Sequence, residues 1–128
     1  MIVVMAGLTA GIVTASSQAP TKSTNDGVYT KAQAERGQKI FAEKCSVCHE
    51  PSRFTGEAFH DVWDNKPLKE LWDVTTGTMP EDNPGSLKQQ EYGDILAYFL
   101  LLNEYAAGDA ELQGDAASMA VITVEQKR

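Results

Sequence analysis

Two cysteines and a histidine stand close together in the pentapeptide CSVCH, which spans residues 45–49. Cysteines three residues apart at the end of a helix project to nearly the same side. Each sulfur can then add to a vinyl group on one edge of a porphyrin, and the adjacent histidine lies over the ring with a nitrogen directed at the iron. C-x-x-C-H is the attachment motif of haem c. The sequence therefore predicts one covalently bound haem c, linked through Cys45 and Cys48, with His49 as an axial iron ligand.

The sixth coordination position of the iron decides what such a haem does. Of the four methionines, Met1 and Met5 lie in an apolar N-terminal stretch and Met119 lies in the acidic tail, whereas Met79 lies in a loop rich in proline and glycine over residues 77–85. A thioether is a soft ligand that favours ferrous iron and raises the reduction potential. With both axial positions filled, neither substrate nor oxygen binds. Met79 as second axial ligand therefore predicts an electron-transfer protein and not an enzyme.

Other arrangements of the same residues remain as alternatives. His60 is a rival sixth ligand, but it lies only eleven residues after His49, so its loop would not easily reach the far face of the ring. A haem enzyme or sensor with a displaceable sixth ligand is a second alternative. A third is a module without haem, in which Cys45, Cys48 and the two histidines hold zinc, or the cysteines form a redox dithiol. No second CxxC-like pair and no βαβ pattern accompany the cysteines.

Helical periodicity and capping residues predict three main helices, over residues 31–44, 66–76 and 87–103. Thr30 is the expected cap of the first helix, Asn65 that of the second, and Ser86 with Gln89 forms a capping box before the third. A glycine inside a helix costs up to about 1 kcal/mol, so Gly37 is expected to let another backbone approach. The fold class is all-α, with long loops that wrap a cofactor.

The segments between these helices show no sustained period. Residues 49–64 are expected to form a loop with one short turn. In the loop over residues 77–85, Pro80 disfavours helix at Met79 and holds it in extended backbone. The stretch VITVE in the tail is expected to form a short strand or to lie over the core.

The N-terminal stretch from Ile2 to Ala15 carries no charge, and its fourteen residues are too few for a helix across a bilayer, which needs about 20. It is typical of a secretory signal with small residues at two possible cleavage points, after Ala15 or after Ala19. A retained anchor is the alternative. Residues 1–19 are therefore predicted to be a cleaved signal peptide that exports the protein to the periplasm, with no stable membrane span afterwards.

The mature chain divides into three parts by composition. Residues 20–30 are predicted to be a flexible lead-in, residues 31–104 the haem domain, and residues 105–128 an acidic extension that packs on the domain or is flexible. With 11 basic and 18 acidic residues, the net charge is −7. That balance argues against nucleic acid and anionic membranes as partners. It permits a redox partner with a basic docking patch.

Over residues 32–104 the chain resembles class I cytochromes c. The similar features are Gly37 and Phe41 ahead of CSVCH, the pair Met79-Pro80, and the final helix with Ala-Tyr-Phe-Leu at 97–100. The resemblance implies the small cytochrome c fold, in which a glycine and an aromatic residue let the first and last helices cross nearly at right angles. It also implies methionine as the sixth ligand.

A narrower resemblance is to the mono-haem c-type cytochromes that accompany periplasmic quinoprotein dehydrogenases. It rests on residues 78–87 and 92–98 and on the tail with Ala-Gly-Asp at 107–109. It implies that electrons come from a dehydrogenase containing pyrroloquinoline quinone and pass to a terminal oxidase or another cytochrome. The chain departs from the pattern of this family in one respect, because His49 and Met79 are only thirty residues apart. One haem edge is therefore expected to be thinly covered, and the reduction potential of the haem to be somewhat lower.

Overall fold

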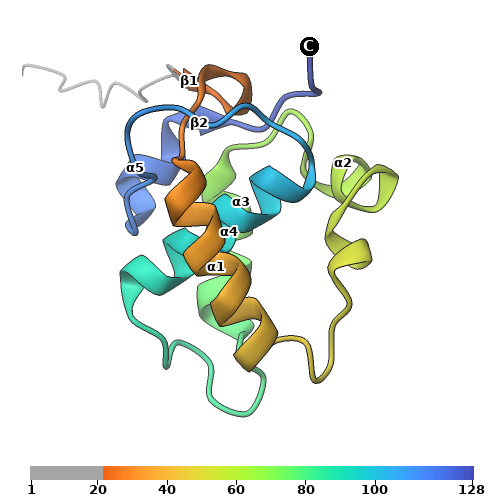
Figure 1. Ribbon diagram of the computed structural model, residues 1–128, viewed down its shortest axis with the longest axis vertical. Helices are drawn as coiled ribbons and strands as arrows, with labels where there is room; N and C mark the ends of the chain where they lie inside the picture. The colour runs from red at the N-terminus through yellow and green to blue at the C-terminus, as the bar shows by residue number, and fades with distance from the viewer. Residues whose placement is uncertain (1–21) are drawn as a thin grey trace, which may run out of the picture.

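A computed structural model describes residues 22–128, and the predicted signal peptide over residues 1–19 lies outside them. This part of the chain is mostly helical, which confirms the all-α fold class (Figure 1). It contains five α-helices, two short strands and two 3-10 helices: β1 Lys22–Ser23, η1 Thr24–Asp26, α1 Lys31–Lys44, η2 Pro51–Phe54, α2 Glu57–Trp63, α3 Leu68–Thr78, α4 Gln89–Leu102, α5 Ala116–Ala120 and β2 Ile122–Thr123. Within residues 22–128, no helix is long and apolar enough to span a membrane.

The crossing of α1 and α4 organises the fold (Figure 1). The cap predicted for α1 is confirmed, because the Thr30 hydroxyl accepts a hydrogen bond from the Gln33 amide at 3.1 Å. At the crossing, a β-carbon added to Gly37 would lie 1.8 Å from the carbonyl oxygen of Asp94. The expectation that another backbone approaches this glycine is therefore confirmed.

The final main helix is buried along most of its length. Nine consecutive residues of α4, from Tyr92 to Leu100, are buried. Phe41 of α1 packs against Tyr98 and Phe99, with ring centroids 5.6 and 6.0 Å apart. A helix that is apolar on nearly every face must be covered on several sides, and α1, α3 and the C-terminal extension provide that cover.

The segment over residues 49–64 is more ordered than its sequence predicts, because it contains η2 and α2. Phe59 of α2 is buried in the core. The Asn103 side chain joins the segment to the end of α4: its Oδ1 accepts from the Gly56 amide at 3.0 Å, and its Nδ2 donates to the Phe54 carbonyl at 2.8 Å. A helix of seven residues completes fewer than two turns, so it leaves little periodic signal in the sequence.

The predicted capping box before α4 is wrong by two residues. The helix begins at Gln89 behind Lys88, and the Glu91 carboxylate accepts from the Lys88 amide at 2.8 Å. Ser86 lies earlier, in the loop, where its amide donates to the Asn83 carbonyl. Lysine is not a preferred capping residue, whereas Ser86 with Gln89 matches the capping-box pattern, so the sequence pattern favours the earlier start.

The predicted cap of α3 is also wrong, because that helix begins at Leu68 behind Pro67. Asn65 has a positive φ of 62° and precedes the helix by three residues. Its amide donates to the Val124 carbonyl at 2.8 Å, and the Val124 amide donates to the Lys66 carbonyl at 2.9 Å. Asn65 therefore turns the chain so that it can pair with the C-terminal extension.

The N-terminal segment from Lys22 onward lies against the C-terminal extension. β1 pairs in parallel with β2, with Lys22 opposite Ile122 and Ser23 opposite Thr123. Tyr29 is fully buried and its hydroxyl donates to the carbonyl of Tyr105 at 2.6 Å. Residues of the C-terminal extension thus contact the N-terminal segment at both β2 and Tyr105.

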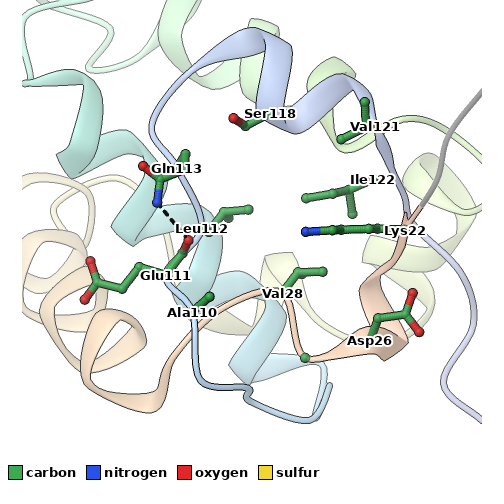
Figure 2. A pocket seen from close by; sticks show the side chains of 11 residues that line it. Lys22, Asp26, Val28, Ala110, Glu111, Leu112, Gln113, Ser118, Val121 and Ile122 are labelled. Atoms are coloured by element: carbon green, nitrogen blue, oxygen red, sulfur yellow. Dashed lines mark hydrogen bonds between the residues drawn. The ribbon is translucent and has the colours of Figure 1, made fainter. Parts of the chain in front are cut away.

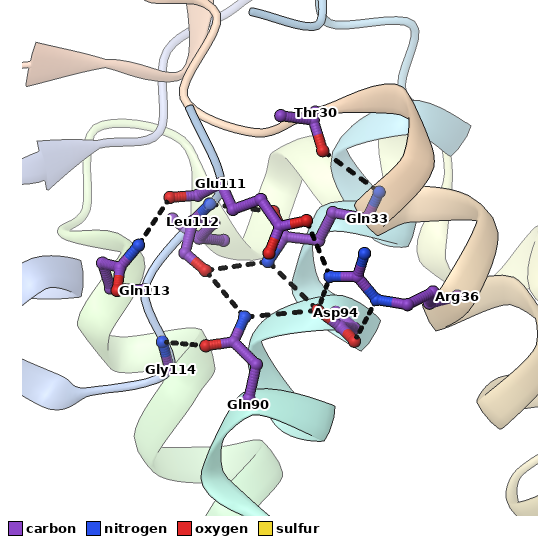
Figure 3. A network of polar contacts seen from close by, with 9 residues as sticks. All are labelled: Thr30, Gln33, Arg36, Gln90, Asp94, Glu111, Leu112, Gln113 and Gly114. Atoms are coloured by element: carbon purple, nitrogen blue, oxygen red, sulfur yellow. Dashed lines mark hydrogen bonds and ion pairs between the residues drawn. The ribbon is translucent and has the colours of Figure 1, made fainter. Parts of the chain in front are cut away.

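A polar network fastens that extension to the helix crossing (Figure 3). The Asp94 carboxylate, only 4% exposed, accepts from Arg36 Nε at 3.0 Å, from Gln33 Nε2 at 3.1 Å and from Gln90 Nε2 at 3.2 Å. The Leu112 amide in turn donates to Gln33 Oε1 at 2.8 Å. The N-terminal segment from Lys22 and the C-terminal extension therefore lie together at one end of the described molecule, whereas the loops after α1 and α3 lie at the opposite end (Figure 1).

Candidate functional site

The end of the molecule formed by the loops after α1 and α3 holds a cavity of about 780 Å³. Its volume falls in the range of about 300–1,000 Å³ that is usual for cofactor sites. The cavity brings together Cys45, Cys48, His49 and Met79, the four residues that the sequence predicts to hold a haem. His60 is not among the residues that line it.

A tight turn after α1 places the cysteines and the histidine on the cavity wall. The Cys45 amide continues the helix by donating to the Phe41 carbonyl at 2.9 Å. The Cys45 carbonyl then accepts from the amides of Cys48 at 3.1 Å and His49 at 2.9 Å. Cys45 is half-buried, Cys48 is exposed, and both thiols are free. The local spacing and this turn therefore present two sulfurs and one imidazole to the same space.

The thiols are poorly suited to the chemistry of a redox dithiol. Burial raises the pKa of the Cys45 thiol above its ordinary value, whereas reactive dithiols depend on a lowered pKa. A zinc site finds no better support: across residues 22–128, no three His, Cys, Asp or Glu side chains converge to hold a metal ion. Neither observation favours the alternatives without haem.

His49 carries an unsatisfied nitrogen. Its ring packs edge-on against Phe54, with centroids 5.6 Å apart. Nδ1 is buried, and it is the one buried side-chain nitrogen or oxygen in the described part of the chain without a hydrogen-bond partner. Leaving such a group unpaired costs about 1–3 kcal/mol. An imidazole with spare bonding capacity beside an apolar cavity fits a group that brings its own metal.

Met79 faces the same cavity from the end of α3. Its backbone is extended, with φ −122° and ψ 148°, as predicted from the proline that follows it. Its amide donates to the Thr75 carbonyl at 3.1 Å, and its carbonyl accepts from the Tyr92 hydroxyl at 2.7 Å. A thioether is thus held at the cavity on a backbone that is fixed at both its amide and its carbonyl.

The rest of the wall is largely apolar, and the sequence did not single it out. Leu71, Ile95 and Phe99 line it from α3 and α4. Phe54 stacks on Phe99 with centroids 4.5 Å apart and planes within 8° of parallel. Phe54 lies in a segment without periodicity, so no local signal marked it. An apolar and partly aromatic cavity excludes water and suits an aromatic macrocycle.

His60 belongs to different surroundings. Its Nδ1 lies 2.7 Å from Oδ1 of Asp64, the residue that follows α2, and its ring packs near Phe59 and Tyr105. These contacts satisfy the imidazole within its own helix and the C-terminal extension. The structure therefore gives no support to His60 as the rival sixth ligand.

A smaller cavity of about 240 Å³ lies near β1 and β2 (Figure 2). Its walls come from the N-terminal segment and the C-terminal extension, and include Lys22, Val28, Leu112 and Ile122. None of the predicted haem-binding residues reaches it. The candidate site is therefore the larger cavity at the opposite end.

Comparison with known proteins supports this interpretation. Residues 32–99 match a family model described as cytochrome c oxidase, cbb3-type, subunit III, which is a c-type cytochrome domain. A search of curated proteins gives no significant match, and neither does a search of solved structures. The matched residues make up more than half of the 128-residue chain and contain CSVCH and Met79. A domain of this kind implies haem c as its cofactor and electron transfer as its general role. This chain therefore belongs to the family described as cytochrome c oxidase, cbb3-type, subunit III, and is a c-type cytochrome.

Proposed function

We propose that the protein is an exported cytochrome with a single haem c, attached through Cys45 and Cys48 and ligated by His49 and Met79. One observation carries the proposal: side chains from two separate segments, the turn after α1 and the end of α3, line one apolar cavity of cofactor size. The orphaned ring nitrogen of His49 and the free thiols support it. The bound haem supplies a reversible one-electron couple between ferric and ferrous iron.

The chain's own residues attach, orient and insulate this group. Each cysteine adds its S–H across a vinyl C=C bond, so that the sulfur bonds to one carbon, the hydrogen goes to the other, and no atom is lost. His49 and Met79 would hold the iron of the bound group through an imidazole nitrogen and a thioether sulfur, and would leave no open coordination position for substrate or oxygen. The aromatic and aliphatic wall excludes water and so reduces the reorganisation that accompanies each change of charge.

Electrons are exchanged at the exposed edge of the cavity. Val47, between the two cysteines, is 86% exposed, and Val74 on α3 is 49% exposed. Both line the cavity, as do the exposed Glu81 and Asp82 in the loop after α3. Exposed apolar side chains beside a cofactor are typical of a transient docking surface. The two carboxylates favour a partner with basic residues around its own redox centre.

The proposed partners are a quinoprotein dehydrogenase as donor and a terminal oxidase or another cytochrome as acceptor. The sequence resemblance over residues 78–98 supports the donor, and the family description, which names an oxidase subunit, supports an oxidase as acceptor. Export to the periplasm is supported by the apolar leader and by a haem that covalent attachment would retain in an open compartment. A division into a signal at 1–19, a haem domain at 31–104 and a packed acidic extension at 105–128 completes the proposal.

The proposal is tested by purifying the matured protein and mixing it with a quinoprotein dehydrogenase and its substrate. Reduction of the haem within the turnover time of the dehydrogenase, with a low-spin spectrum in both oxidation states, is the expected result. A spectrum that shifts on addition of carbon monoxide would point to an open sixth position and to a haem enzyme or sensor instead. Failure to accept electrons from the dehydrogenase would remove the proposed donor.

Reversing the charge of Glu81 and Asp82 at the exposed edge of the cavity is expected to slow electron exchange with a basic partner. In the double variant Glu81→Lys/Asp82→Lys, the second-order rate at low salt should fall by roughly tenfold, because electrostatic steering contributes about one to three orders of magnitude to association. Stopped-flow measurements across ionic strength check this, and the wild-type rate should fall as salt is added.

The matched control is Glu35→Lys/Asp109→Lys, which makes the same change of charge at two exposed positions outside the residues lining the cavity. Both doubles are also compared at physiological salt, where charges farther apart than about 8 Å are screened. There the rate of the control should stay within about twofold of the wild-type rate, whereas Glu81→Lys/Asp82→Lys should remain slower. Equal slowing in both doubles would show that only net charge matters and would remove the assigned surface.

A further inference from the structure

We infer that Tyr92 is a positioning residue that sets the place of Met79 at the cavity through its phenolic hydroxyl. The inference rests on the proposed function, in which the sulfur of Met79 binds the iron. The hydroxyl donates to the Met79 carbonyl at 2.7 Å and accepts from the Leu87 amide at 3.5 Å. One side chain therefore bonds to both ends of the loop that carries the second axial ligand.

That loop has little else to hold it. Residues 81–86 are exposed, and the hydrogen bonds within the loop join its own backbone groups, as from the Asn83 amide to the Pro80 carbonyl. Among residues 22–128, no side chain other than that of Tyr92 donates a hydrogen bond to, or accepts one from, residues 79–87. The Tyr92 hydroxyl is therefore the side-chain link between a solvent-exposed loop and the core.

Tyr92 is itself rigidly held. It is fully buried in the first turn of α4, and its ring meets that of Trp72 edge-on with centroids 6.2 Å apart. Its ring also lines the cavity, together with Ile95 and Phe99 of the same helix. α4 is the helix that α1 crosses in close contact at Gly37. The Tyr92 hydroxyl therefore links the Met79 backbone to a helix that is itself held in place by this crossing.

The bond goes to the backbone of Met79 and not to its sulfur. The Tyr92 hydroxyl therefore does not compete with the iron for the sulfur, while the α-carbon is held between the Thr75 carbonyl and the phenol. Without the hydroxyl, the Met79 carbonyl keeps only the longer contact from the Gly85 amide at 3.3 Å. The expected consequence is a methionine that an external ligand displaces more easily.

The test is the variant Tyr92→Phe in matured holoprotein, titrated in the ferric state with imidazole, which competes with Met79 for the sixth position. Losing one buried hydrogen bond should raise the apparent affinity for imidazole by about three- to tenfold. The near-infrared sulfur-to-iron band should disappear at correspondingly lower imidazole concentration. Unfolding by denaturant is measured alongside, to separate ligand exchange from global stability.

Two variants make the same change elsewhere. Tyr98→Phe removes a hydroxyl on the same helix that has no hydrogen bond within the described residues. Tyr29→Phe removes a buried hydroxyl that donates to a backbone carbonyl, that of Tyr105, away from the cavity. Both should keep the wild-type affinity for imidazole, even though Tyr29→Phe lowers stability.

Unchanged imidazole affinity in Tyr92→Phe, or an equal increase in Tyr29→Phe, would overturn the positioning role. A wild-type protein that lacks the sulfur-to-iron band would overturn Met79 as ligand, and the inference with it. The two failures are therefore distinguished by the wild-type spectrum, which is recorded before any variant is compared.

Discussion

Replacing Met79 with leucine is expected to lower the reduction potential by about 0.1–0.3 V and to abolish the near-infrared sulfur-to-iron band. Leucine keeps nearly the same volume at the end of α3, so the cavity wall is preserved while the thioether is lost. A thioether favours ferrous iron, and its removal therefore stabilises the ferric state. Potentiometric titration and near-infrared absorption of the matured variant measure the two effects.

The matched control is Met119→Leu. Met119 is fully buried in α5 and does not line the cavity, so the same exchange should leave both the potential and the band unchanged. If Met79→Leu kept the wild-type spectrum and potential, another group or none would fill the sixth position. The protein would then resemble a haem enzyme or sensor more than an electron carrier.

The variant Gly37→Ala, which adds a single methyl group, is expected to lower the free energy of unfolding by more than about 4 kcal/mol. Only the most damaging single substitutions have effects of this size. The new β-carbon would meet two backbone atoms of Asp94, its carbonyl oxygen at 1.8 Å and its carbonyl carbon at 2.4 Å. Neither atom can turn aside as a side chain does, so α1 and α4 must separate. Denaturant unfolding of the holoprotein, followed by circular dichroism, measures the loss.

Gly77→Ala is the control for Gly37→Ala. Gly77 also lies within a helix, α3, but no atom lies within 4 Å of its added β-carbon. Because alanine is a better helix former than glycine by up to about 1 kcal/mol, this variant should be neutral or slightly more stable. Equal and small effects at both positions would contradict the close helix crossing.

The sequence contains most of the information on the chemistry because that chemistry is local. Cys45, Cys48 and His49 lie within five residues, and a single turn brings them to one cavity. Met79 was predicted because the other three methionines lie in the N-terminal stretch and in the acidic tail. The residues that line the cavity include Met79. α1 was predicted with the bounds that the structure has, because Thr30 caps it and nearly all of its residues other than Gly37 favour helix.

The parts that sequence reasoning missed depend on distant partners. β1 is ordered by β2, and their paired residues lie about a hundred positions apart in the chain. α2 is too short to show a period. The residue before it, Gly56, donates a hydrogen bond to the Asn103 side chain, which lies 47 positions later in the chain. Tyr92 is a similar case, since nothing in the sequence shows which carbonyl its hydroxyl reaches. Such contacts are properties of the assembled fold.

The most direct test of the account is the intact mass of protein expressed with haem maturation machinery and then extracted under denaturing conditions. Two thioether bonds predict an added mass of about 616 Da that survives unfolding. The variant Cys45→Ala/Cys48→Ala should carry no such mass. Wild-type protein that is recovered at the mass of the bare polypeptide, while a known cytochrome c matures normally in the same cells, would contradict the central claim.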